Sequence, residues 1–171
     1  MEPVARSEFP VIHTSRFLLR QITRDDIAAI FQGLSDPRVH STCGVSYDTL
    51  QATQRQMDWY EALYANGTGI WWAICANDKE IDLLGTCGFS SHDCPHRRAE
   101  IGYWLLPENW GRGMAGECVA AVVSHGFEVM GLHRISADVD VGNHRSSQLL
   151  ERLGFRFEGI RRGCEFKQGR F

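Results

Sequence analysis

Three glycines stand within a short segment directly before a helical pattern. Gly111, Gly113 and Gly116 lead into apolar residues that recur at helical spacing over residues 113–130, and Gly131 follows as a C-cap. Small residues at such a turn let backbone N–H groups approach an anion closely, and the positive end of the helix dipole adds to the attraction. Arg112 supplies a charge beside them. We therefore expect a phosphate or pyrophosphate site at residues 111–116.

The same glycines are compatible with two alternatives. One is an ordinary turn that uses glycine for its dihedral angles. The other is the dinucleotide-binding pattern G-x-G-x-x-G, which they match, with Asp138 or Asp140 at a suitable distance. In that fold, however, the strand runs directly into the first glycine, whereas residues 107–110 intervene here and little sequence remains after the turn. No Gly-Lys-Ser/Thr follows, which excludes a P-loop.

Hydrophobic periodicity and turn residues predict an alternation of strands and helices. The strands are expected over residues 16–22, 70–76, 81–89, 99–106, 135–141 and 155–160, and the helices over residues 24–36, 47–64, 113–130 and 143–153. Pro37 ends the first helix, and residues 77–80 form a hairpin turn. Residues 90–98 read as a polar loop. This order fits neither a β-sandwich nor a strictly alternating parallel fold, so we expect an α/β domain with a mixed sheet.

Length and composition set the broad class. The 171 residues suit one domain, residues 1–171. No apolar run approaches the roughly 18 residues of a membrane span, and residues 1–10 lack the apolar stretch of a secretory signal, so we expect a cytoplasmic protein. The net charge of −3 gives no footprint for nucleic acid. The six cysteines are scattered, without the spacing of a zinc site, and we expect no metal.

Around these glycines the sequence resembles the GCN5-related N-acetyltransferase (GNAT) superfamily, whose signature is Gln/Arg-x-x-Gly-x-Gly/Ala. Gly113 and Ala115 match its last two positions, and Trp110 departs from its first. With Trp110 the chain is similar to the RimJ/RimL branch of ribosomal-protein alanine acetyltransferases. The further matching segments are residues 14–20, 100–105, 107, 110–115, 132–135, 143, 146, 149–155 and 158–159. The resemblance covers nearly the whole chain.

The resemblance implies a mainly antiparallel sheet in which two parallel strands, residues 99–106 and 135–141, part to admit acetyl-CoA. The residues expected to hold the cofactor are Leu105 or Leu106 for the pantetheine, then Gly111, Arg112, Gly113, Met114, Ala115 and Gly116 for the pyrophosphate, with Asn143 and Ser146. The family usually has one more strand after the segment at residues 168–171, where this sequence stops. A missing last strand and strand exchange in a homodimer are the two alternatives.

Acetyl transfer to an amine requires a neutral nucleophile, whereas amines with a pKa near 8 to 10.4 are largely protonated at neutral pH. Glu100, beside the expected thioester, is the candidate base; an ordinary surface or ion-paired carboxylate is the alternative. Ser146 is the candidate donor to the departing sulfur, because no tyrosine stands near it in the sequence; helix capping is its alternative. Attack is expected to be direct, in a ternary complex.

The acceptor is expected to be a protein N-terminus or a small amine, and a catalytically silent acyl-CoA-binding module is the competing function. His92, Asp93 and His96 would line the acceptor site or belong to a solvated loop. The aromatic side chains on the central strands would line the pocket or pack in the core; these are Trp71, Trp72, Tyr103 and Trp104.

Overall fold

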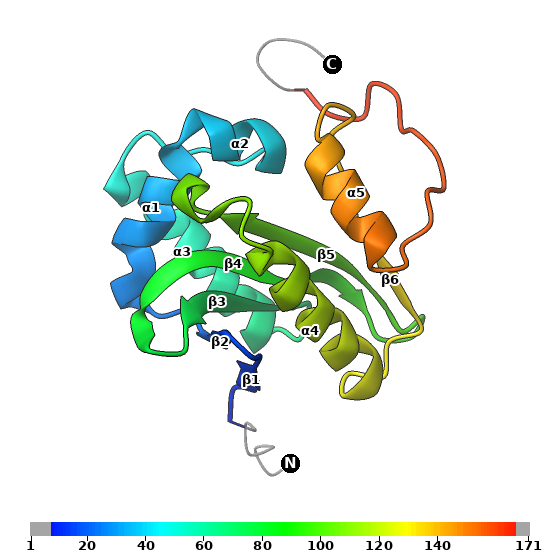
Figure 1. Cartoon of the computed structure of the whole chain (residues 1–171), viewed down its shortest axis with the longest axis horizontal. Helices are drawn as coiled ribbons and strands as arrows, with labels where there is room; N and C mark the ends of the chain where they lie inside the picture. The colour runs from blue at the N-terminus through cyan, green and yellow to red at the C-terminus, as the bar shows by residue number, and fades with distance from the viewer. Residues whose placement is uncertain (1–7, 167–171) are drawn as a thin grey trace.

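The computed structural model describes residues 8–166 and contains one mixed sheet with helices on both faces (Figure 1). The described elements are β1 (Ile12–His13), β2 (Phe17–Gln21), η1 (Arg24–Asp26), α1 (Ile27–Ser35), α2 (Pro37–Cys43), α3 (Leu50–Ala65), β3 (Ile70–Ala76), β4 (Lys79–Asp93), β5 (Arg98–Leu105), η2 (Pro107–Asn109), α4 (Met114–Glu128), β6 (Arg134–Ser136) and α5 (His144–Arg152). The strands lie in sequence order, β1 to β6. All neighbours are antiparallel except β5 and β6, which run parallel. The expected mixed α/β class is confirmed.

The sheet separates two apolar cores. One lies between the sheet and α4, where Trp72, Phe89 and Val119 are buried. The other lies between the sheet and helices α1 to α3, around Ile30 and Trp104. Because side chains alternate along a strand, neighbouring tryptophans such as Trp71 and Trp72 contribute to opposite faces. The sheet is therefore covered on both sides, and the position of a residue on β5 fixes the face that it reaches.

Most expected elements are present. β3 has the predicted bounds, β2, α1, α3, α4 and α5 differ only at their ends, and the hairpin between β3 and β4 turns at residues 77–78. Helix α2 was not predicted, because a proline after a helical pattern is an ordinary stop signal. Pro37 instead occupies the first turn of α2, where a missing N–H costs nothing, and the Asp36 carboxylate caps the helix by accepting from the N–H of Arg38.

Three predictions about strands were wrong. Residues 90–93 belong to β4, so the polar loop is reduced to residues 94–97. β6 ends at Ser136 instead of residue 141, because the chain there leaves β5 and loses its hydrogen-bonding neighbour. Residues 155–160 form no strand: they pair with no other strand in the described chain, and Phe157 is 76% exposed. Residues 168–171 lie outside the described part.

Residues 8–166 hold neither a membrane span of the helical kind nor a metal cluster. No helix among them is long and apolar enough to cross a membrane. In the same range no group of three or more His, Cys, Asp or Glu side chains is arranged to hold a metal ion.

Candidate functional site

A cleft opens where β5 and β6 part. The two strands are paired at Arg98 with Arg134 and at Glu100 with Ser136, and no pair follows. At the closed end the Arg97 carbonyl accepts from the N–H groups of His133 (2.6 Å) and Arg134. Beyond Glu100, β5 runs on to Leu105 while the other chain turns away. The cleft encloses about 2170 Å³, which exceeds the roughly 300–1,000 Å³ of an ordinary small-molecule pocket.

The free edge of β5 presents backbone groups to this cleft. The Leu106 N–H donates to the Leu84 carbonyl of β4 (2.9 Å), so by strand alternation the peptide groups of Tyr103 and Leu105 point the other way, into the opening. The Leu105 carbonyl accepts from Nε1 of Trp110 (2.9 Å). Both backbone groups of Leu106 are occupied, because its carbonyl accepts from Asn109. Of the two candidates, the geometry therefore favours Leu105 and not Leu106.

The glycine-rich turn forms one end of the cleft. Gly111 (φ +76°) and Gly113 (φ +73°) are left-handed, a conformation that costs other residues energy. Gly113 is the N-cap of α4, and the next three N–H groups, those of Met114, Ala115 and Gly116, have no acceptor within the helix. All of these residues line the cleft, an arrangement of backbone donors that is suited to an anion.

Arg112, unlike Gly111 and Gly113 on either side of it, does not line the cleft. It is exposed and, within the described chain, its side chain is not among those that line the cleft. Its carbonyl oxygen accepts a hydrogen bond (3.1 Å) from Arg16, a residue that does not line the cleft. The structure therefore does not bring the Arg112 guanidinium to the site, although the sequence suggested it as a charged contact.

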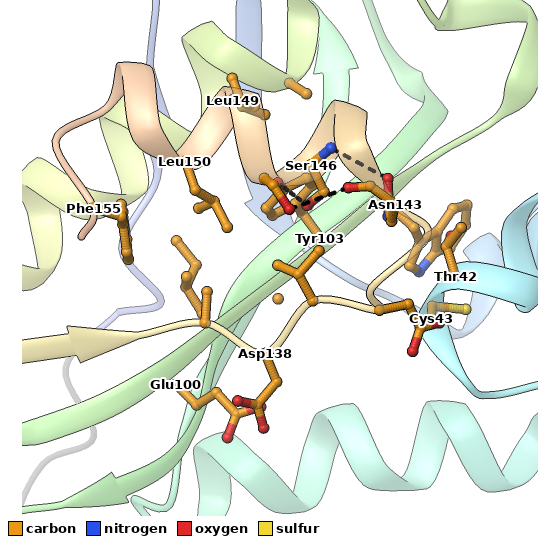
Figure 2. Close-up of a pocket in the computed structure, with 18 of the residues that line it drawn as sticks. Thr42, Cys43, Glu100, Tyr103, Asp138, Asn143, Ser146, Leu149, Leu150 and Phe155 are labelled. Carbon is orange, nitrogen blue, oxygen red and sulfur yellow. Dashed lines mark hydrogen bonds between the residues drawn. The ribbon is translucent and has the colours of Figure 1, made fainter. Parts of the chain in front are cut away.

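The first turn of α5 closes the cleft opposite β5. The Asn143 side chain caps this helix, its Oδ1 accepting from the Ser146 N–H (3.2 Å). Because Asn143 is the cap, the Ser146 hydroxyl is available for another partner, and it lies 2.6 Å from the phenol oxygen of Tyr103 (Figure 2). Burial raises the pKa of Tyr103, although the hydrogen bond with Ser146 opposes the rise. Tyr103 is therefore protonated at neutral pH.

Glu100 lies at the last residue pair before the strands part. It is half-buried and lines the cleft, and within residues 8–166 no cation or hydrogen-bond donor pairs with its carboxylate. The nearby Asp138 is ion-paired with Arg161. Alternation along β5 puts Glu100 on the α1–α3 face and Tyr103 on the α4 face. Figure 2 shows the Glu100 carboxylate turned away from the Tyr103–Ser146 pair.

An aromatic surface lies on the same face as Glu100. Gly88 and Gly102 are paired on β4 and β5, and the Trp71 indole lies across both: a Cβ at Gly102 would come within 2.6 Å of its ring. The indole N–H donates to Thr86 (2.9 Å). The Trp59 ring of α3 meets the Trp71 ring edge-on, with centroids 5.2 Å apart. Trp59 and Trp71 both line the cleft.

Of the remaining candidates from the sequence, Trp104 lines the cleft, and four others are not brought to it. His92, Asp93 and His96 lie around the β4–β5 turn, outside the cleft lining, where Asp93 accepts from the His96 N–H and pairs with Arg98. Trp72 is fully buried in the core beneath α4. Tyr103 was missed as a partner of Ser146, because the two residues are distant in the sequence and meet only across the cleft.

Comparison with known proteins agrees with this geometry. Residues 16–156 match the acetyltransferase (GNAT) domain family. The chain is 40% identical over 162 residues to the uncharacterised N-acetyltransferase YoaA of Bacillus subtilis, covering 94% of this chain and 91% of that protein.

Solved structures share the fold. Spermidine N-acetyltransferase from Vibrio cholerae, in complex with CoA and spermine, has a TM-score of 0.80 at 23% identity. The match covers 92% of this chain and 90% of the Vibrio cholerae chain. The ribosomal L7/L12 α-N-protein acetyltransferase RimL, in complex with coenzyme A, has a TM-score of 0.82 at 19% identity. The match covers 95% of this chain and 93% of the RimL chain. At these identities the likeness concerns the fold alone.

Proposed function

The chain belongs to the GNAT family and is an N-acetyltransferase, and on that premise we propose that it transfers the acetyl group of acetyl-CoA to a primary amine by direct attack in a ternary complex. One observation carries the proposal: the parting of β5 and β6 opens a cleft that ends at the N–H groups of the α4 first turn, which have no acceptor within the helix. A long ligand with an anionic middle and a slender acyl-bearing arm fits this combination.

Acetyl-CoA is proposed to bind along this path. The N–H groups from Gly113 to Gly116 would hold the pyrophosphate, with Gly111 giving the turn its shape. The pantetheine arm carries amides, and the peptide groups of Tyr103, together with the N–H of Leu105, would bond them as a neighbouring strand does, since the Leu105 carbonyl is taken by Trp110. Asn143 keeps its side-chain NH₂ for the cofactor, since only its Oδ1 is used in capping α5.

Glu100 is the proposed base. Its carboxylate lies where the strands part, without a competing cation among the described residues, so it can accept the proton that the ammonium form of the acceptor must lose, directly or through water. The amine then attacks the acetyl carbonyl carbon, a C–N bond forms, and the C–S bond breaks; the attacking nitrogen loses a second proton, which balances the proton that the sulfur gains. An N–H on the open edge of β5 would stabilise the oxygen that gains charge in between.

The Tyr103–Ser146 pair is proposed to receive the leaving sulfur. The departing thiolate needs a proton or a hydrogen bond, and the phenol of Tyr103 carries a proton at neutral pH because burial raises its pKa. Ser146 orients that phenol at 2.6 Å. The Glu100 and Tyr103 side chains leave β5 on opposite faces, so the acceptor would enter from the α1–α3 side and the sulfur would leave towards α5.

The acceptor proposed is a protein N-terminal α-amine or a small aliphatic amine. Two features of the α1–α3 side support it: the Glu100 carboxylate, which has no partner among the described residues, and the aromatic surface of Trp71 and Trp59. An ammonium group is attracted both to a carboxylate and to the face of an indole ring. The fold neighbours include an enzyme named for spermidine and one named for a ribosomal protein.

The test is thiol release from acetyl-CoA with mass spectrometry of the products, using panels of N-terminal peptides, polyamines, amino acids and aminoglycosides. We expect an acetylated amine in the peptide or the polyamine class, formed in equal amount to free CoA. Tight CoA binding without product from any class would contradict the proposal and favour a silent acyl-CoA-binding module.

A further inference from the structure

The turn that precedes β2 is hydrogen-bonded to the first turn of α4. The backbone N–H of Arg16 and the Ser15 hydroxyl donate to one oxygen of Glu117 (3.0 and 2.8 Å). Nε of Arg16 donates to the other oxygen (2.7 Å). The two segments lie 101 residues apart in the sequence, so this contact ties the start of the sheet to the glycine-rich turn.

The guanidinium of Arg16 also fixes the peptide between Arg112 and Gly113. Its Nη1 donates to the Arg112 carbonyl (3.1 Å). In a trans peptide the C=O and the following N–H point in opposite directions. A carbonyl held outward by Arg16 therefore leaves the N–H of Gly113 directed towards the cleft, which Gly113 lines. Arg16 thus selects the orientation in which this N–H can meet an anion.

The same contact neutralises a carboxylate close to the anion site. Glu117 follows directly after the three helical N–H groups that face the cleft. Although burial alone would raise the pKa of Glu117, hydrogen bonds from Thr14, Arg16 and Ser15 lower it to about 2. Glu117 is thus fully ionised at neutral pH, and an unpaired negative charge in this turn would repel a phosphate.

We propose that Arg16 is a positioning residue for the acyl-CoA: it orients the N–H of Gly113 and cancels the charge of Glu117, without touching the ligand. Among the described residues, neither Arg16 nor Glu117 lines the cleft, which argues against direct contact. The inference rests on the proposed binding of the pyrophosphate at this turn, and it assigns a role to a residue that lies almost 100 positions before the turn that it organises.

The test compares the dissociation constants of CoA and of pantetheine, which lacks the pyrophosphate, for the full chain and its variants. We expect Arg16→Gln to weaken CoA binding about tenfold, the effect of losing one charge-assisted hydrogen bond, and to leave pantetheine binding unchanged. Arg16→Lys keeps the charge but not the two-sided contact and should fall in between. In the Arg16→Gln background, Glu117→Gln should recover part of the lost CoA affinity.

Arg24→Gln is the matched control, because Arg24 also pairs with carboxylates, Asp58 and Glu61, but far from the turn. It should leave both ligands unaffected. Equal weakening of CoA and pantetheine by Arg16→Gln, or no change in either, would overturn the inference. A wild-type chain that binds no CoA would contradict the proposed function itself, an outcome that is separate from any difference between variants.

Discussion

The phenol oxygen of Tyr103 and the hydroxyl oxygen of Ser146 lie 2.6 Å apart across the cleft, on elements that are separated by 43 residues. This contact joins β5 to the first turn of α5 at the place where the strands have already parted. It pairs a proton-bearing phenol with a hydroxyl that orients it, which suits a group that meets the leaving thiolate.

Tyr103→Phe should lower kcat about 100-fold and change KM for acetyl-CoA little, because general acid catalysis contributes about 10²-fold or more while the phenol adds little to ground-state binding. Ser146→Ala should have a smaller effect in the same direction. Steady-state kinetics with the acceptor found by the panel checks both. Tyr47→Phe is the control, since the Tyr47 hydroxyl bonds Gln56 (3.1 Å) away from the Tyr103–Ser146 pair. A Tyr103→Phe enzyme with full kcat would remove the phenol from the mechanism.

Glu100→Gln should reduce kcat/KM about 100-fold at neutral pH, where a base is needed to free the amine. The loss should shrink as pH rises towards the pKa of the acceptor amine, since the amine then loses its proton without help. Rate profiles between about pH 6 and 10 measure this. Glu128→Gln, an exposed carboxylate at the end of α4, serves as control. Parallel profiles for wild type and Glu100→Gln would argue against a base at this position.

Gly113→Ala should raise KM for acetyl-CoA, because an alanine at φ +73° strains the turn that presents the N–H groups. The strain should also cost about 1–2 kcal/mol of unfolding free energy. Gly131→Ala is a matched control: Gly131 has φ +66° with open space around it, beyond the other end of α4. Urea denaturation should show similar losses for both variants, and kinetics should show the KM effect only for Gly113→Ala. An equal KM for acetyl-CoA in both variants would contradict a role of the Gly113 turn in cofactor binding.

The lowered pKa of Glu117 predicts how the unfolding free energy depends on pH. Its pKa is lowered to about 2 from an ordinary 4.5, so the native state favours the charged form. Its stabilisation is fully present above the ordinary pKa and is lost as pH falls through the folded value. Between about pH 5 and pH 2 the wild type should therefore lose more unfolding free energy than Glu117→Gln. Urea titrations across that range give the unfolding free energy of each protein as a function of pH. Identical slopes for the two proteins would mean that the contacts of Arg16 and Ser15 with Glu117 are not formed in solution.

Local patterns were enough to predict much of the fold. The bounds of β3 followed from an apolar run closed by turn residues, and α4 from its glycines and helical spacing. The run of backbone N–H groups at the start of α4 could be predicted because it consists of consecutive residues, and its binding of an anion stays a prediction. Residues 155–160 misled for a physical reason: their composition suits a strand, but a strand requires a neighbour, and the described chain supplies none there.

Contacts between distant segments were not predictable. The side of β5 on which a peptide group points depends on pairing with β4, and this pairing occupies the N–H of Leu106 and turns the N–H of Leu105 away from β4. Likewise, Ser146 was identified from its place on α5, but its partner Tyr103 emerges only when β5 and α5 are brought together. The contact between Arg16 and Glu117 could not be predicted from any local sequence pattern, because the two residues are 101 positions apart.

Backbone hydrogen exchange of the full chain with and without CoA, read by mass spectrometry or NMR, tests the proposed cofactor site itself. We predict that CoA slows exchange at the free edge of β5, Tyr103 and Leu105, and at the first-turn amides from Gly113 to Gly116, while the far end of α4 is unaffected. Protection confined to other segments, or none in this cleft at saturating CoA, would contradict the claim that the parted strands and the start of α4 form the cofactor site.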